Sequence, residues 1–157
     1  MKPTIILAAL LLFLAACEPD PVQQDLLTYV NDGITQISAL ESEAIEAYAS
    51  VSGPNYDSDS VMYAVIQTTV IPKYEEFYSK LKAIQPSTAE VKKMHEEYIT
   101  AAADQLEAFR LILEAIEKQD AAIIERANED LDKARAMLNQ WRKDLDEECK
   151  EHGVTIE

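Results

Sequence analysis

The residue types that most often bind metals or attack substrates are scarce in this sequence. Among its 157 residues are two cysteines, Cys17 and Cys149, and two histidines, His95 and His152. Cys149 and His152 are three residues apart, which places them on one turn of a helix, and a thiolate beside an imidazole suits zinc or copper. His95 becomes a third candidate ligand if it lies at the same end of a helical fold. Alternatively, His152 is a favourable residue at a helix C-terminus and Cys149 is inert core packing.

Motifs for catalysis or cofactor binding are missing. The sequence has no Gly-x-Ser-x-Gly elbow, no glycine-rich phosphate loop and no His-Glu-x-x-His motif. The Glu-x-x-His pairs of di-iron bundles are absent too, because Lys92 precedes His95 and Cys149 precedes His152 at that spacing. Carboxylate pairs such as Glu96-Glu97 are typical of a solvated helix face. We therefore predict a protein that is not an enzyme and has no cofactor.

The charge balance excludes one class of partner. With 14 basic and 29 acidic residues the formal net charge is −15. Nucleic acids need a basic binding face, so they are not expected as partners. Anionic lipid headgroups would also repel the chain, so any attachment to a membrane has to rest on something other than charge.

The N-terminal segment has the layout of an export signal. Lys2 supplies one positive charge, and an apolar run from Ile5 to Phe13 follows. The run is too short for a permanent membrane span but suits the hydrophobic part of a signal peptide. It ends in Leu14-Ala15-Ala16-Cys17, an apolar residue and two small residues before a cysteine.

These four residues resemble the lipobox of bacterial lipoproteins. The resemblance implies that residues 1–16 are removed, that Cys17 carries the acyl chains (diacylglyceryl and palmitate), and that residues 17–20 form a lipidated tether. It also implies a position on the extracytoplasmic face of the cell membrane, or at the outer membrane if the source is Gram-negative. The acyl chains would make the membrane a partner. The rest of the chain looks like small uncharacterised helical lipoproteins of the cell envelope, and this likeness implies no specific role. With Cys17 acylated, Cys149 has no disulfide partner.

Glycine and proline divide the rest of the chain into four helical segments. The predicted helices cover about 21–52, 58–84, 88–118 and 121–152. Asp20 and Asp120 are expected N-caps, Ser87 with Glu90 forms the S-x-x-E capping box, and Gly153 is an expected C-cap.

Apolar residues at three- and four-residue steps predict the buried faces. In the first helix the predicted stripe is Leu27, Val30, Ile34, Ile37, Leu40, Ala44, Tyr48 and Val51. Gly33 lies within this helix, where it either permits a close helix contact or is a weak point costing about 1 kcal/mol relative to alanine. Pro72 predicts a kink near residues 68–71. Gln105 falls on the apolar stripe of the third helix and is the polar group expected to need a buried partner.

Four amphipathic helices with short connections predict an all-α, antiparallel up-down four-helix bundle over residues 21–157. A tether of three residues between Cys17 and the first helix would hold this bundle close to the membrane. The loop at 53–58 would then face away from it, with Tyr56 either exposed as an aromatic for recognition or packed over the end of the core. The function expected is that of a non-catalytic helical interaction module in the cell envelope. The alternative is a binding protein for a metal or a small cationic ligand at the bundle end or in its core.

Overall fold

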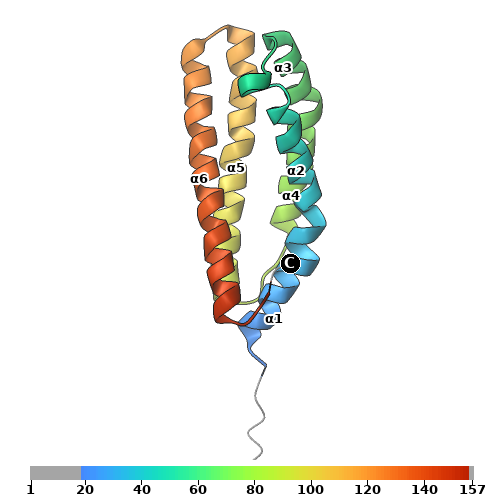
Figure 1. The fold of residues 1–157 in the computed structure, drawn as a ribbon, viewed down its shortest axis with the longest axis vertical. Helices are drawn as coiled ribbons and strands as arrows, with labels where there is room; N and C mark the ends of the chain where they lie inside the picture. The colour runs from blue at the N-terminus through green and yellow to red at the C-terminus, as the bar shows by residue number, and fades with distance from the viewer. Residues whose placement is uncertain (1–18, 156–157) are drawn as a thin grey trace, which may run out of the picture.

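The described part of the chain, residues 19–155 of a computed structural model, is built from helices (Figure 1). The first helix comprises α1 (Pro21–Thr28), the π-helical turn η1 (Tyr29–Ile34) and α2 (Thr35–Ala49). After a short 3-10 turn, η2 (Gly53–Asn55), the second comprises α3 (Asp59–Val65), the π-helical turn η3 (Ile66–Val70) and α4 (Ile71–Ala83). The third and fourth helices are α5 (Ala89–Lys118) and α6 (Ala121–Glu151). The prediction of an all-helical fold with four helices is confirmed.

The helices pack side by side along their length. α6 packs against α5, and α4 packs against both α2 and α5. In Figure 1 the α5–α6 pair stands on one side of the molecule and α2 with α4 on the other. The buried core runs between them and is rich in aromatic rings. Tyr98 of α5 stacks on Trp141 of α6 with 3.9 Å between ring centroids, and Tyr74 of α4 meets Phe109 of α5 edge-on.

The π-helical turn η1 changes which residues of the first helix are buried. Leu27 was predicted to lie on the buried stripe, and this is wrong, because its side chain is 42% exposed. Leu26 and Tyr29 fill the core instead, at 0% and 2% exposure. A π-turn takes up about one residue more than an α-turn, and one residue corresponds to a rotation of about 100°. The stripe before the turn is therefore shifted by one position relative to the stripe after it.

Gly33 lies in η1, where a second segment comes close. A Cβ added at Gly33 would be 3.2 Å from Cδ1 and 3.3 Å from Cγ2 of Ile84, which follows α4. Both distances are tighter than ordinary van der Waals contact. Of the two interpretations open from the sequence, the close helix contact is therefore the one that the structure supports.

The second π-helical turn, η3, ends two residues before Pro72, which is the second residue of α4. Proline has no backbone N–H to donate, and within a regular α-helix its ring would clash with the carbonyl of Thr68. Ile66 and Val70, at the two ends of η3, are both fully buried. The helix thus continues past the proline with its apolar side still in the core.

The helix caps agree with the sequence at two of three expected N-termini. Asp20 accepts hydrogen bonds from the backbone N–H groups of Val22 (2.9 Å) and Gln23 (3.4 Å). Asp120 accepts one from Ala122 at 2.9 Å. Gly153, the expected C-cap residue, has a positive φ of 66°. This left-handed backbone ends α6.

The predicted capping box at the start of α5 is wrong. Thr88, not Ser87, is the N-cap residue, and it makes no capping hydrogen bond with its own side chain. The carboxylate of Asp25, from α1, takes that role. It accepts hydrogen bonds from the backbone N–H groups of Ser87 (2.9 Å) and Thr88 (2.7 Å) and from the Thr88 hydroxyl (2.7 Å). A carboxylate from a neighbouring helix reaches both N–H groups at once, which the Ser87 hydroxyl does not.

Within residues 19–155, no helix combines the length and the apolar character needed to cross a lipid bilayer. The predicted signal sequence and Cys17 fall outside the described residues.

Candidate functional site

The three candidate metal ligands are not gathered into one site. Among the described residues, no group of three or more His, Cys, Asp or Glu side chains is placed to hold a metal ion. His95 of α5 is buried, and its Nδ1 lies 3.4 Å from the hydroxyl of Tyr29 in η1. Burial is also the main cause of the lowered pKa of His95, so this imidazole is neutral over a wider pH range than usual.

His152 belongs to a different set of contacts, which joins the end of α6 to the start of α1. Its Nδ1 lies 2.5 Å from Oδ2 of Asp20, and its Nε2 lies 3.4 Å from Glu148. The backbone carbonyl of His152 accepts a hydrogen bond from the side chain of Gln23 at 2.7 Å. The hydrogen bond to Asp20 raises the pKa of His152, and the same bond lowers the pKa of Asp20.

Cys149 is a buried thiol on the last turns of α6. It is 2% exposed and forms no disulfide within residues 19–155. Burial raises its pKa, so the reactive thiolate is less populated than in an exposed cysteine. Tyr56, the aromatic of the 53–58 loop, is exposed, and its hydroxyl donates a hydrogen bond to Asp59 at 2.9 Å.

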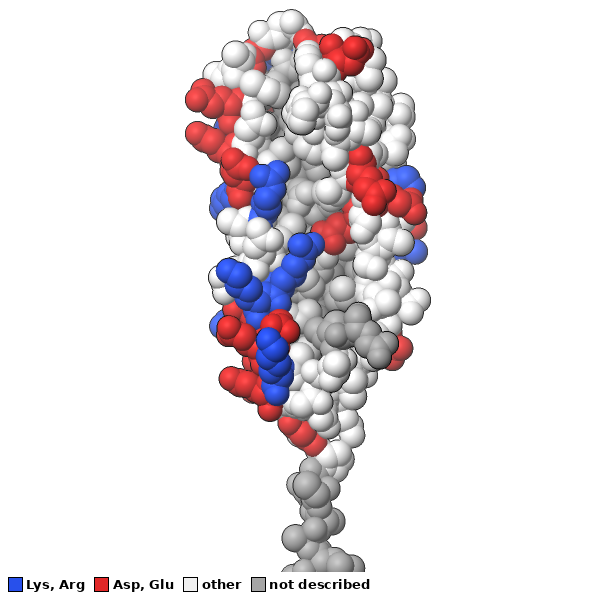
Figure 2. All heavy atoms as spheres, viewed as in Figure 1, with Lys and Arg blue, Asp and Glu red and all other residues white. Residues whose placement is uncertain are grey.

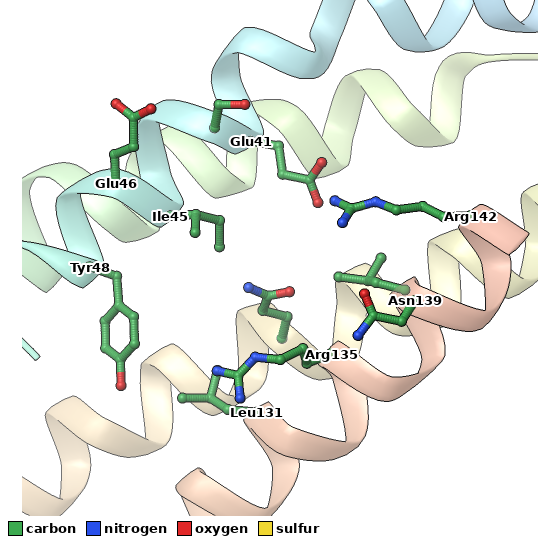
Figure 3. A pocket seen from close by; sticks show the side chains of 11 residues that line it. Glu41, Ile45, Glu46, Tyr48, Leu131, Arg135, Asn139 and Arg142 are labelled. Carbon is green, nitrogen blue, oxygen red and sulfur yellow. The ribbon is translucent and has the colours of Figure 1, made fainter. Parts of the chain in front are cut away.

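A cleft between α2 and α6 gathers polar groups that the sequence did not single out as a set. Its volume is about 350 Å³. Figure 3 shows Glu41, Ile45 and Tyr48 entering from α2, and Leu131, Asn139 and Arg142 from α6. Gln105 of α5 also lines it. The walls therefore combine charged, amide and apolar side chains, the mixture found in sites for small molecules.

Two glutamates line this cleft, and in Figure 3 the side chain of Glu41 points into it, whereas that of Glu46 points away. Oε2 of Glu41 accepts a hydrogen bond of 2.8 Å from the hydroxyl of the buried Tyr98. Burial raises the pKa of Glu41, and the Tyr98 hydrogen bond and the nearby Arg142 only partly oppose this. An ionised carboxylate here loses much of its contact with water, so a cationic group that reached it would be attracted strongly.

Gln105 is the buried amide of the cleft. The sequence predicted that it would be buried and need a partner, and the structure confirms the burial, at 8% exposure. Its Oε1, however, accepts no hydrogen bond from the described part of the chain. A buried amide oxygen without a donor costs about 1–3 kcal/mol. Gln105 lines the cleft, and this oxygen itself is covered, so a ligand reaches it when the amide turns toward the cleft.

Arg142 and Arg135 provide the positive charge on the α6 side. In Figure 3 the side chains of Glu41 and Arg142 point toward one another across the cleft. They attract each other without forming an ion pair within 4.0 Å, and Arg142 has no ion pair with any residue of the range 19–155. Arg135 is partly neutralised, because its Nη1 lies 2.7 Å from Asp132.

The surface of the α6 side carries a group of basic side chains. Figure 2 shows them at the middle of the molecule, with acidic side chains beside them on the same side and further charges of both signs on the opposite edge. This basic group stands out because the whole chain carries a formal charge of −15. Together, the opposed charges, the free amide oxygen and the apolar walls can bind a ligand that has both a cationic and an anionic end.

Two of the main residues of the cleft, Glu41 and Arg142, were missed by the sequence analysis, and only Glu41 gives a weak signal in the sequence. Glu41 is four residues after the buried Ile37 and seven before Tyr48, so it lies on the inward side of α2. Arg142 gives no such signal, since it directly follows the core residue Trp141 and looks like any exposed position. Its role depends on the separation of α2 from α6, which is a property of the assembled fold.

Comparisons of the chain with protein-family models, with curated proteins and with solved structures gave no match.

Proposed function

We propose that this protein is a membrane-anchored, extracytoplasmic lipoprotein whose helical domain is a non-catalytic binding module for a component of the cell envelope. The α2–α6 cleft is its binding site. The observation that carries the binding role is the unpartnered Oε1 of Gln105 in a cleft where Glu41 and Arg142 also face each other. A buried amide oxygen without a partner, next to opposite charges that form no ion pair with each other, is better explained by a ligand than by stability.

The anchor rests on the lipobox-like residues and on the position of the fold relative to them. The fold begins at Asp20, which caps α1 and contacts His152, three residues after Cys17. A lipid on Cys17 would therefore hold the domain directly at the membrane surface, with no long linker. Attachment through acyl chains also suits an acidic protein that anionic headgroups would repel.

The arrangement proposed for the helices is an antiparallel up-down bundle, with the second helix kinked at Pro72. Contacts between distant segments support it. Gln23 bonds to His152, which brings the start of the first helix to the end of the fourth. Tyr63, early in the second helix, donates to Glu117 at the end of the third at 2.5 Å. Small-angle scattering should report a rod about 45 Å long, the length of a 30-residue helix.

The anchor is tested by labelling cells with radioactive palmitate. The unaltered chain should take up label and sediment with membranes, whereas Cys17→Ser should do neither, and globomycin should block removal of the leader. Cys149→Ser is the matched control, because it also removes one of the two thiols but lies outside the leader. Equal labelling of the Cys17→Ser variant would refute the anchor.

The binding role is tested by photo-crosslinking in intact cells. A photoreactive amino acid at position 42, which lines the cleft, should give a specific adduct that is lost when Arg142→Gln is added. The control position is Thr100, which is exposed on α5 and does not line the cleft. The binding role of the cleft is contradicted if both positions give the same adducts, or if Arg142→Gln has no effect.

The alternative, a site for a small cation, is supported by a second groove, between α5 and α6. It has a volume of about 300 Å³, and it is lined by one lysine, one methionine and six carboxylates: Glu90, Glu97, Asp144, Glu147, Glu148 and Glu151. Because no metal-binding group of three is formed among the described residues, an organic polycation fits this groove better than a metal ion. Titration with spermidine should then show binding that Glu147→Gln weakens, and elemental analysis of the purified protein tests the metal.

A further inference from the structure

We propose that the α2–α6 cleft binds a zwitterionic ligand of the amino-acid type, with a free ammonium group, a free carboxylate and an apolar side chain. The proposal rests on the proposed function, because it assigns a ligand class to the same cleft. In the bound state the ammonium group lies against Glu41 and the amide oxygen of Gln105, and the carboxylate lies against Arg142.

The charges in the cleft select a zwitterion over a simple ion. A purely cationic ligand would meet Arg142, which has no ion pair within the described range. A purely anionic ligand would meet Glu41 and the field of a chain with a formal charge of −15. A zwitterion has no net charge for that field to repel, and its two ends match the two walls. The side chains of Glu41 and Arg142 already point toward one another in Figure 3. The ammonium end of the ligand would lie against Glu41, and its carboxylate end would lie against Arg142.

The hydrogen-bonding groups select the same chemistry. Oε1 of Gln105 needs a donor, and an ammonium group has three N–H donors, one for this oxygen and others for Glu41. Arg142 offers a planar fork of N–H donors that matches a carboxylate. Asn139 and Ser42, which also line the cleft, can bond to a peptide group if the ligand is longer than one residue.

The volume and the apolar walls of the cleft indicate the size of the ligand and the nature of its side chain. A volume of about 350 Å³ equals roughly a dozen water molecules at about 30 Å³ each, which suits an amino acid or a dipeptide. Ile45, Leu131 and Leu138 line the cleft beside the polar groups and would cover an aliphatic side chain. A free amino acid and a dipeptide with free termini share the recognised chemistry, and the titrations below distinguish them.

The test is calorimetric titration of the full chain, purified from the cell fraction in which it is found, with four probes. They are L-leucine, L-leucyl-L-alanine, N-acetyl-L-leucine, which lacks the ammonium group, and L-leucinamide, which lacks the carboxylate. One of the first two should bind, and the tighter of them identifies the ligand as a single amino acid or a dipeptide. Each blocked probe should bind at least tenfold more weakly, a difference of about 1.4 kcal/mol.

Substitutions then assign each end of the ligand to its wall. Arg142→Gln should weaken the zwitterion at least tenfold and leave the weak binding of leucinamide unchanged. Glu41→Gln should weaken the zwitterion and leave the binding of N-acetyl-leucine unchanged. Lys143→Gln is the matched control, because it removes the same charge from the neighbouring position of α6, outside the cleft, and should change nothing.

Gln105→Leu tests whether the Gln105 amide binds the ligand or only supports the fold. Replacing the unpartnered amide with an apolar side chain should raise the melting temperature while lowering the affinity for the zwitterion at least tenfold. A variant that binds the zwitterion as well as the unaltered chain removes Gln105 from the site.

The ligand assignment is overturned if neither zwitterion binds at millimolar concentration, or if a blocked probe binds as tightly. The crosslinking experiment then separates the two proposals. An Arg142-dependent adduct at position 42 means that the cleft is a binding site and the ligand class is wrong. Absence of that adduct together with absence of binding overturns both.

Discussion

Glu41 and Gln105 are polar side chains at positions where the fold provides few hydrogen-bond partners. Among residues 19–155, Tyr98 is the one side chain that donates a hydrogen bond to Glu41, and none donates to the amide oxygen of Gln105. An apolar or neutral residue at either position would leave the packing of the helices intact. Positions where a sequence departs from the choice that stability favours are often functional, and two of them meet here in one cleft.

Glu41→Gln is predicted to stabilise the protein at neutral pH. Burial raises the pKa of Glu41 above its value in the unfolded chain, so folding favours the protonated form. The loss of stability caused by ionising Glu41 is therefore absent at low pH. It appears as the pH rises through the usual carboxyl range and is complete above the raised pKa of Glu41. The neutral glutamine avoids this cost and can still accept the Tyr98 hydrogen bond.

Thermal unfolding followed by circular dichroism checks this. The melting temperature of Glu41→Gln should exceed that of the unaltered chain at neutral pH, and the difference should vanish below about pH 3.5, where the carboxyl is protonated in both states. Glu43→Gln, on the same helix but ion-paired with Lys73, should be neutral or slightly destabilising. An unchanged or lower melting temperature for Glu41→Gln at neutral pH would contradict the prediction.

His152 is predicted to titrate above the ordinary histidine range. Its hydrogen bond to Asp20 raises its pKa, so the stabilisation from the pair is complete below the unfolded pKa of about 6.5 and is lost as the pH rises through the folded value. At the acid side, the lowered pKa of Asp20 means that the pair is lost only as the pH falls through that lower value. NMR titration of the imidazole should show the raised pKa, and Asp20→Asn should move it back toward 6.5.

The elements show how far the sequence determines this fold. Apolar periodicity and the glycine and proline positions are local signals, and the observed helices 21–49, 59–83, 89–118 and 121–151 lie within three residues of the predicted limits. The shift from Leu27 to Leu26 was not predictable from that pattern, because a π-turn leaves no local signature when the stripe on each side of it is regular. Likewise Ser87 with Glu90 satisfied the capping pattern, yet Asp25 from another helix took the role.

Asp25→Ala is predicted to destabilise the protein by about 2 kcal/mol, as expected for loss of a buried carboxylate that accepts hydrogen bonds from two backbone N–H groups and a hydroxyl. Burial would raise the pKa of Asp25, but the hydrogen bonds from Thr88 and Ser87 outweigh it and hold the pKa below the usual value. Urea unfolding measures the change. Ser87→Ala is the comparison variant and should cost much less, because its side chain does not cap α5. An equal loss in both variants would restore the capping-box interpretation.

Gly33→Val is predicted to destabilise the protein by about 1–3 kcal/mol, the range for overpacking a closely packed site. Even a Cβ at this position would lie 3.2 Å from Ile84, and valine adds two methyl groups. Gly33→Ala should cost less, since alanine is a better helix former and Ile84 can move slightly. Combining Gly33→Val with Ile84→Ala should recover part of the loss. If the two changes are simply additive in urea unfolding, the two sites do not contact each other as described.

At the scale of the whole molecule, self-repulsion is the main electrostatic effect. The formal charge of −15 is spread over a slender helical fold. The ion pairs between exposed side chains, such as Arg110 with Glu75 at 2.7 Å, contribute little each in water. Screening by salt therefore weakens the repulsion among the excess carboxylates more than it weakens the attraction within these ion pairs.

We accordingly predict that moderate salt stabilises the protein. Raising sodium chloride from about 0.01 M to about 0.15 M shortens the screening length from about 30 Å to about 8 Å. The melting temperature should rise by several degrees, and the rise should shrink at acid pH, where many carboxylates are protonated. A melting temperature that falls with added salt at neutral pH would show that attractive pairs dominate instead.

The contact of His152 with Asp20 has a mechanical consequence. Because the carboxylate that begins α1 is bonded to the imidazole that ends α6, a pull applied at residue 20 is shared by the first and the last helix. The side chain of Gln23, bonded to the carbonyl of His152, adds a second link one turn further in. The first helix and the end of α6 are therefore loaded together. Both links precede Leu26, the first fully buried core residue of the described chain, so opening from this end begins with them.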